Sequence, residues 1–98
     1  MSESPFTTAA ILGAGSFGTA LAKLLAPRLT SAVLIGRDAA TTQAINRDHE
    51  NPHYLSGILL AGNVTASCRV EDALAHPLVI FAVPTSATRE MAQQLAAA

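Results

Sequence analysis

Three glycines within six residues, 13 to 18, constrain the fold of this chain more than any other feature. The run Thr7–Leu12 before them is apolar and β-branched, which predicts a strand buried on both faces. Residues 17 to 25 after them repeat apolar side chains at helical spacing. Pro27 should end that helix, because a proline pushes the preceding residue out of the α region. The pattern predicts a strand, a glycine turn and a helix.

The rest of the chain continues this alternation. Ser31–Ile35 is a second apolar run, begun within about 25 residues of the first, as a right-handed parallel crossover requires. We then expect a helix from Asp38, its N-cap, to Ile45, an irregular stretch Asp48–Asn63, a strand Val64–Arg69, a helical turn Glu71–His76, a fully buried strand Pro77–Val83 and a helix Thr85–Ala98. Alternating strands and helices predict an α/β fold, a doubly wound parallel sheet of the Rossmann type with helices on both faces.

The expected sheet stops after about four strands, whereas doubly wound sheets usually continue to a fifth and a sixth. The last helix places Ala87, Met91 and Leu95 on one stripe toward the core and ends without a stop signal. We therefore expect residues 1–98 to be an incomplete domain, a piece of a longer protein. Its fourth strand would have an unpaired edge, which predicts marginal stability and self-association.

Length, charge and hydropathy exclude several classes of protein. The 98 residues suffice for one domain, and the net charge of −1, with six Lys and Arg spread along the chain, argues against a nucleic-acid partner. The longest apolar run is far short of the roughly 20 residues that a membrane span needs. The first residues lack the basic region of a secretory leader, so we expect a cytoplasmic protein.

Cysteine and histidine offer little chemistry. Cys68 is the single cysteine, which excludes an internal disulfide and a cysteine-rich zinc site; in the predicted strand it should be a small buried hydrophobic residue. His49 and His53 lie four residues apart, but Pro52 intervenes and no third ligand is near, so no metal site is predicted. Lys23 should be exposed to solvent and is not a candidate for catalysis.

The glycine loop is the predicted ligand site. In the G-x-G-x-x-G pattern, Gly13 permits the tight turn, Gly15 lets the backbone approach a pyrophosphate, and Gly18 lets the helix pack on the strand. The N–H groups at Ser16 and Phe17 would then point at the phosphates from the helix N-terminus. The alternative is a glycine turn that binds no ligand.

The end of the second strand should select the cofactor, because an acid there binds a ribose 2′-hydroxyl and an arginine meets a 2′-phosphate. Arg37 lies 19 residues beyond Gly18, and no acid precedes it on the strand. NADP(H), or use of both cofactors, is therefore favoured over strict NAD. In the alternative interpretation Arg37 is a solvated loop residue. Asp38 is expected only to cap a helix.

With these residues in place, the chain resembles the N-terminal domain of bacterial NAD(P)-dependent glycerol-3-phosphate dehydrogenases. The glycine loop is common to many dehydrogenases, but a series of residues after the second helix is much more particular to this family: Asn46, His49, Asn51, Tyr54, Leu55 and Asn63. The matching segments cover residues 10–22, 34–38, 45–55, 60–64 and 81–89, which together span nearly the whole chain.

The resemblance implies reversible hydride transfer between NAD(P)H and dihydroxyacetone phosphate, which gives a phospholipid precursor. It implies cofactor contacts at Ser16, Phe17 and Arg37, and it places Pro84 and Thr85 beside the nicotinamide half; it assigns no role to Tyr54. The family's catalytic lysines come later in the chain, and no residue here matches them. Residues 1–98 alone should therefore be inactive.

Other functions remain open at this point. The chain could be a nucleotide-sensing module without catalysis, or part of a reductase of ketopantoate or a hydroxyacid that uses the same loop. The expected partners are a nicotinamide dinucleotide and, for the longer protein, a small phosphorylated substrate. A homodimer is an additional expectation.

Overall fold

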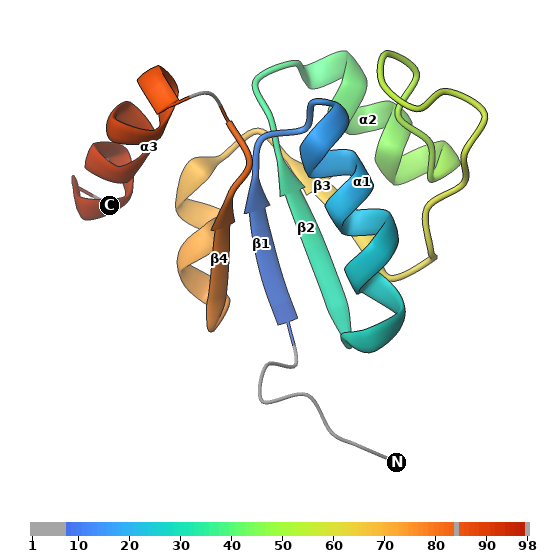
Figure 1. Cartoon of the computed structure of the whole chain (residues 1–98), viewed down its shortest axis with the longest axis horizontal. Helices are drawn as coiled ribbons and strands as arrows, with labels where there is room; N and C mark the ends of the chain where they lie inside the picture. Colours follow the sequence, from blue (N-terminus) through green and yellow to red (C-terminus); the bar gives the residue numbers. More distant parts are fainter. Residues whose placement is uncertain (1–7, 84, 98) are drawn as a thin grey trace.

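Strands and helices alternate along the chain in the predicted order (Figure 1). The structure is a computed structural model that describes residues 8–83 and 85–97. Its elements are β1 (Thr8–Leu12), α1 (Ser16–Leu25), the 3-10 turn η1 (Ala26–Arg28), β2 (Ser31–Ile35), α2 (Ala39–Asp48), β3 (Val64–Ser67), the 3-10 helix η2 (Val70–Ala75), β4 (Leu78–Phe81) and α3 (Thr85–Ala97). No helix within these described ranges has the length and apolar character needed to cross a membrane.

The four strands form one parallel sheet in the order β3-β2-β1-β4. In the register, Ala10 of β1 lies between Val33 of β2 and Val79 of β4. The chain moves outward through β2 and β3 and then crosses to the other side of β1, so the strand order reverses between β1 and β4. The predicted α/β doubly wound sheet is confirmed, and its carboxyl edge, at the top of Figure 1, carries the glycine loop.

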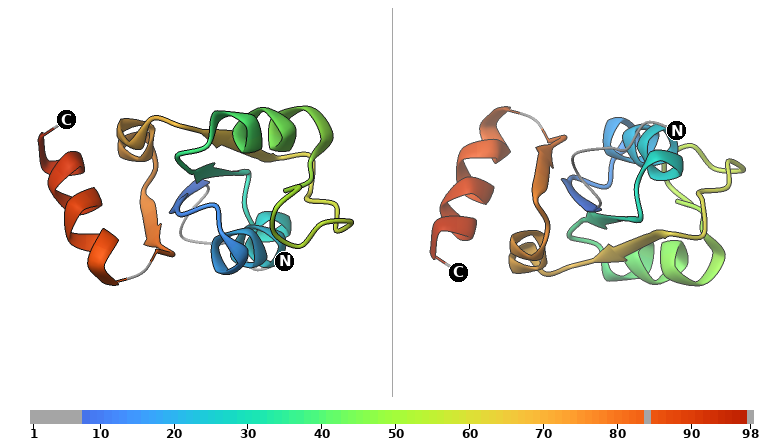
Figure 2. Two further views of the ribbon diagram at one scale, coloured as in Figure 1. Left: turned by 90° about the horizontal axis from the view of Figure 1, so that it is seen from above. Right: turned by 90° about the horizontal axis from the view of Figure 1, so that it is seen from below.

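Side chains alternate between the two faces of the sheet and build two separate cores. On one face the helices α1 and α2 and the segment 49–63 cover a buried cluster: Ile11, Ala22, Ala26, Leu34, Ile45, Leu60 and Val64. On the other face η2 and α3 cover a second cluster: Ala10, Leu12, Val33, Ile35 and Ala73. Figure 2 shows α3 beyond β4, away from α1. The prediction of helices on both faces is therefore confirmed.

The strands differ in burial because they differ in position. The central strand β1 is buried along residues 9–12, as predicted. The prediction of a fully buried fourth strand is wrong, because β4 lies at the edge of the sheet and its residues are only half-buried. Leu95 of α3 packs on the second core as expected, whereas the side chains of Ala87 and Met91 lie outside the described residues.

Some element ends differ from those predicted. The helix α1 ends at Leu25 and a 3-10 turn follows, yet Ala26 keeps helical angles (φ −54°, ψ −40°), so Pro27 does not act by displacing the residue before it. The helix α2 continues beyond Ile45 to Asp48. The strand β3 ends at Ser67, two residues before the predicted end.

The prediction that Cys68 is a buried strand residue is wrong. Because β3 ends at Ser67, Cys68 lies in the bend that follows and is exposed. Its Sγ lies 3.3 Å from the Thr42 Oγ1 of α2. A residue beyond the last ladder position no longer alternates between the faces of a sheet, so its place in an apolar pattern does not predict burial.

Two asparagine side chains near the two ends of β3 form hydrogen bonds to backbone groups. Asn46 of α2 donates its Nδ2 to the Ala66 carbonyl (3.0 Å) and accepts the Ala66 N–H at Oδ1 (2.7 Å). Asn63 donates its Nδ2 to the Ala26 and Leu29 carbonyls (2.8 and 3.0 Å). Asn46 thus joins α2 to the edge strand β3, and Asn63 joins the end of the 49–63 segment to η1 and the residue after it.

Candidate functional site

The turn after β1 requires glycine at its first position. Gly13 has a φ of +120°, a conformation that side chains rarely adopt. A Cβ at this position would collide with the Ala82 carbonyl oxygen and would lie 2.7 Å from Cγ1 of Val83. The segment after β4 therefore packs directly on the turn after β1, at the point where the strand order reverses.

The other two glycines of the loop have different surroundings. A Cβ on Gly18 would overlap the Gly13 carbonyl oxygen, so glycine is what lets α1 approach the end of β1. Gly15 has an ordinary φ of −82°, and a Cβ there would have nothing within 4 Å. The backbone at Gly15 thus faces open space, which leaves room for a ligand to reach it.

The first turn of α1 begins at the loop. Gly15 is the N-cap, and the Thr19 N–H donates to the Gly15 carbonyl (3.0 Å). The N–H groups of Ser16, Phe17 and Gly18 precede that bond and have no acceptor within the helix. Together with the helix dipole they make this end of α1 attractive to an anion.

Two adjoining hollows lie over the carboxyl edge of the sheet, and we call them together the groove. The first, of about 580 Å³, is lined by Ala14, Gly15, Gly36, Arg37, Asp38, Thr41, Thr42, His53 and Tyr54. The second, of about 390 Å³, is lined by Gly15, Ser16, Phe17, Tyr54, Phe81, Ala82 and Val83. Gly15 and Tyr54 line both hollows, so the groove passes over the glycine loop.

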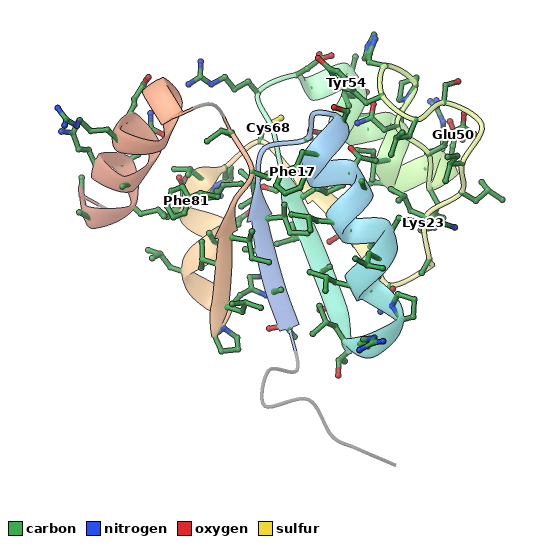
Figure 3. The ribbon with its side chains drawn as sticks, viewed as in Figure 1. Phe17, Lys23, Glu50, Tyr54, Cys68 and Phe81 are labelled. Atoms are coloured by element: carbon green, nitrogen blue, oxygen red, sulfur yellow. The ribbon has the colours of Figure 1, made fainter. Side chains whose placement is uncertain are left out.

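Aromatic side chains flank this groove. Figure 3 labels Tyr54 and Phe17 near the first turn of α1, and Phe81 on β4. Phe17 and Tyr54 are 62% and 47% exposed, so both rings are accessible from solvent. Their position beside the glycine loop suits stacking against a flat ring.

Arg37 follows β2 and lies at the rim of the first hollow. Its side chain is 73% exposed, and its Nη2 lies 3.6 Å from Oε2 of Glu90 on α3. The guanidinium is accessible from the groove, with an acidic neighbour that comes from a distant element. Sequence reasoning placed Arg37 here but had no signal for Glu90.

Asp38 acts as the N-cap of α2, as predicted. Its carboxylate accepts the Ala40 N–H (3.1 Å) and the Thr41 hydroxyl (2.6 Å). The hydrogen bond from Thr41, then that from the Ala40 N–H, lowers the pKa of Asp38 below its ordinary value. His53 lies 3.7 Å from the same carboxylate, so it contributes to a polar rim around the first hollow.

Asn51 is the residue of the site that reasoning from spacing missed. Its side chain is completely buried and contacts the glycine loop, although it belongs to the irregular stretch. The hydrogen bond from Asn51 to the Ala14 carbonyl joins residues 37 positions apart. The family resemblance included Asn51 and Tyr54 but gave neither a role.

The remaining sequence candidates lie as follows. Lys23 is exposed, as predicted, and donates its Nζ to the Leu59 carbonyl (2.7 Å), on the flank of α1 that faces the 49–63 segment (Figure 3). Within the described part of the chain, no group of three or more His, Cys, Asp and Glu side chains gathers as a metal site would require. Pro84 lies outside the described residues.

A family model described as NAD-dependent glycerol-3-phosphate dehydrogenase N-terminus matches residues 8–98. The match contains every described element, from β1 to α3. It includes the glycine loop, Arg37 and the segment 49–63 that supplies Asn51 and Tyr54.

Individual relatives agree with this match. The glycerol-3-phosphate dehydrogenase [NAD(P)+] of Myxococcus xanthus is 45% identical over 82 residues, which are 83% of this chain and 24% of the relative. That of Carboxydothermus hydrogenoformans is 42% identical over 86 residues, which are 87% and 26%. The solved glycerol-3-phosphate dehydrogenase of Plasmodium falciparum superposes with a TM-score of 0.83 at 25% identity, over 92% of this chain and 28% of that one. The chain spans about a quarter of the length of these curated relatives.

Proposed function

Because this chain belongs to the NAD-dependent glycerol-3-phosphate dehydrogenase N-terminus family, we propose that its groove binds a nicotinamide dinucleotide. The observation that carries this proposal is the position of the groove. It crosses the glycine loop at the carboxyl edge of the sheet, where the strand order reverses between β1 and β4. Doubly wound sheets bind dinucleotides at this switch point.

The glycine loop holds the pyrophosphate in this proposal. The open space over Gly15 lets the phosphates approach the backbone, and Gly13 and Gly18 keep the loop tight beneath them. The N–H groups of Ser16 and Phe17 donate to the phosphate oxygens from the start of α1. The positive end of the α1 dipole would favour the charge of the anion at this point.

Arg37 contacts the adenosine ribose at its 2′ position and so distinguishes a 2′-phosphate from a 2′-hydroxyl. Its guanidinium lies at the rim of the first hollow, and a planar, permanently charged group suits bidentate contact with a 2′-phosphate. NADPH is therefore the favoured cofactor, with NADH as a weaker ligand. The second hollow, beside Phe17 and Phe81, would take the nicotinamide half, with Pro84 as a further contact.

The whole reaction is a proposal for the longer protein. When bound, the cofactor supplies a hydride for the reduction of dihydroxyacetone phosphate to glycerol 3-phosphate. Residues 1–98 are the cofactor-binding part, and the catalytic residues lie outside them. Reduction of a ketone needs a cation or proton donor beside the developing alkoxide. Among the residues that line the groove, the one Lys or Arg is Arg37, which lines the first hollow and not the one assigned to the nicotinamide half. A cytoplasmic location and a homodimer are part of the same proposal.

The test is a parallel titration of the chain with NADPH and NADH, followed by thermal shift and calorimetry. We expect tighter binding of NADPH. Arg37→Ala should weaken NADPH binding about tenfold or more, because a charge-assisted hydrogen bond is lost, and should leave NADH binding nearly unchanged. Arg28→Ala is the matched control, since Arg28 is also an exposed arginine but lies in η1 and lines neither hollow.

Two results would contradict the proposal. Failure of the folded chain to bind either cofactor would mean that the glycine loop is only a structural turn. An equal loss of NADPH affinity in Arg37→Ala and Arg28→Ala would mean that Arg37 contributes only general positive charge and does not read the 2′-phosphate.

A further inference from the structure

Asn51 is completely buried within a segment whose other residues are mostly exposed. A buried primary amide is costly unless its donors and its acceptor are all engaged. Every polar atom of the Asn51 side chain has a hydrogen-bond partner. The partners belong to the two sides of the groove, so the residue does more than fill space.

The donor side of Asn51 holds the glycine loop. Its Nδ2 donates to the Ala14 carbonyl (2.9 Å) and to Oγ1 of Thr19 (3.0 Å), which is itself buried in α1. The Ala14 carbonyl and the Gly15 N–H belong to one planar, trans peptide unit. Fixing the direction of that carbonyl therefore fixes the direction of the Gly15 N–H.

The acceptor side of Asn51 holds the backbone of His53 and Tyr54, which line the groove opposite the glycine loop. Its Oδ1 accepts the N–H groups of His53 (3.0 Å) and Tyr54 (3.2 Å). The Tyr54 side chain lines both hollows, and His53 lines the first. A single planar amide thus spans the distance between the loop beneath the groove and the aromatic residue beside it.

We propose that Asn51 is a positioning residue for the dinucleotide. Its amide fixes the Gly15 peptide relative to Tyr54, whose side chain forms one wall of the groove (the Tyr54 wall). The groove is therefore preformed before the cofactor enters. This inference rests on the proposed function, which names the ligand. It adds a residue outside the glycine loop to those that determine cofactor affinity. Preforming a groove raises affinity because less ordering is required when the ligand binds.

Two substitutions at Asn51 and one control substitution test the two sides of the amide. Asn51→Asp keeps an acceptor for His53 and Tyr54 but opposes a carboxylate to the Ala14 carbonyl, so it disrupts the glycine loop selectively. Asn51→Ala removes both sides. Asn63→Asp is the matched control, because the Asn63 Nδ2 also donates to backbone carbonyls, those of Ala26, Leu29 and Thr30, at the amino end of β3, far from the groove.

The experiment has two readouts. NADPH affinity is measured for the four proteins at a temperature where thermal melts show each to be folded. The second readout needs no ligand: the chain has one tyrosine and no tryptophan, so quenching of its tyrosine emission by acrylamide reports the exposure of Tyr54 alone. We expect both Asn51 variants to bind NADPH about tenfold or more weakly, and Asn51→Ala to show increased quenching. Asn63→Asp should lose thermal stability without either change.

Equal NADPH affinity in wild type and both Asn51 variants would overturn the proposal, as would an equal loss of affinity in Asn63→Asp. If the wild-type chain binds neither NADPH nor NADH, the proposed function fails. Tyrosine quenching then still decides whether Asn51 holds the Tyr54 wall, because unchanged quenching in Asn51→Ala would refute that role independently of any ligand.

Discussion

The α-carbon of Gly18, in the first turn of α1, faces the carbonyl oxygen of Gly13 with no room between them for a side chain. This contact joins the start of the helix to the end of β1 and sets the curvature of the loop between them. The same two glycines bracket Gly15, whose backbone faces open space. The close contact between Gly13 and Gly18 therefore tightens the turn while the backbone of Gly15 between them stays accessible.

Gly18→Ala should destabilise the chain by about 1–3 kcal/mol, because the new methyl group forces the loop away from α1. NADPH binding should weaken as well, since the displaced loop no longer presents its N–H groups together. Urea unfolding and cofactor titration measure the two effects. Gly62→Ala is the control, because a Cβ at Gly62 would meet nothing within 4 Å; an equal effect there would contradict the explanation.

Glu90→Gln should increase NADPH affinity about twofold to fivefold, because the Glu90 carboxylate competes with a 2′-phosphate for Arg37 across an exposed 3.6 Å pair. NADH lacks that phosphate, so its affinity should change little. Parallel titrations measure both ligands, and the NADPH effect should shrink as salt is added. A similar gain for both cofactors would show that Glu90 acts on the groove in general and not through Arg37.

Asp38 should make stability depend on pH in the acidic range. Its pKa is lowered by the Thr41 hydrogen bond and the Ala40 N–H, so its stabilising effect is complete above the ordinary value of 3.8 and is lost as the pH falls through the lowered value. The free-energy gap between wild type and Asp38→Asn should therefore stay constant above about pH 5 and narrow as the pH falls from about 4 to about 2 in chemical denaturation. A gap that stays constant over this range would refute the titration of Asp38 as its cause.

Asn46→Ala should destabilise the chain by about 1 kcal/mol, because two hydrogen bonds to the Ala66 backbone of the edge strand β3 are lost. Neither residue lines the groove, so NADPH affinity should stay at the wild-type value. Denaturant melts and titration check both expectations. A large loss of affinity would mean that the β3 edge and the groove are coupled.

The chain should self-associate through the β4 edge as its concentration rises. Within the described residues, β4 pairs with β1 alone, and its residues are only half-buried. An apolar strand with a free edge is a template for pairing with another chain. Sedimentation velocity over a range of concentrations measures this, and a compact, stable monomer throughout would contradict it.

Much of the fold could be predicted because its signals are local. The β2 bounds, Ser31–Ile35, agree at both ends, and the cap at Asp38 is in place. Strand and helix periodicities repeat within a few residues. The positive φ at Gly13 is a local backbone conformation that favours glycine whatever the tertiary surroundings. The family resemblance also rested on residues read in order, and the family model matches the same stretch.

The errors have a common physical cause. The burial of β4 depends on which strands flank it, and the exposure of Cys68 depends on where the β3 ladder stops. Neither quantity is a property of the neighbouring residues in sequence. A hydrophobic pattern reports which side chains prefer to be buried, whereas the partners that bury them come from distant parts of the chain.

By itself, the sequence determined the alternation of strands and helices, the glycine turn and an arginine at the end of β2, because each depends on backbone preference or on spacing within one βαβ unit. Only the tertiary structure decided that Asn51 binds Ala14 and that Glu90 faces Arg37. These contacts join residues 37 and 53 positions apart. They form only after the sheet has ordered its strands and brought its loops to one edge, and no local rule of spacing encodes them.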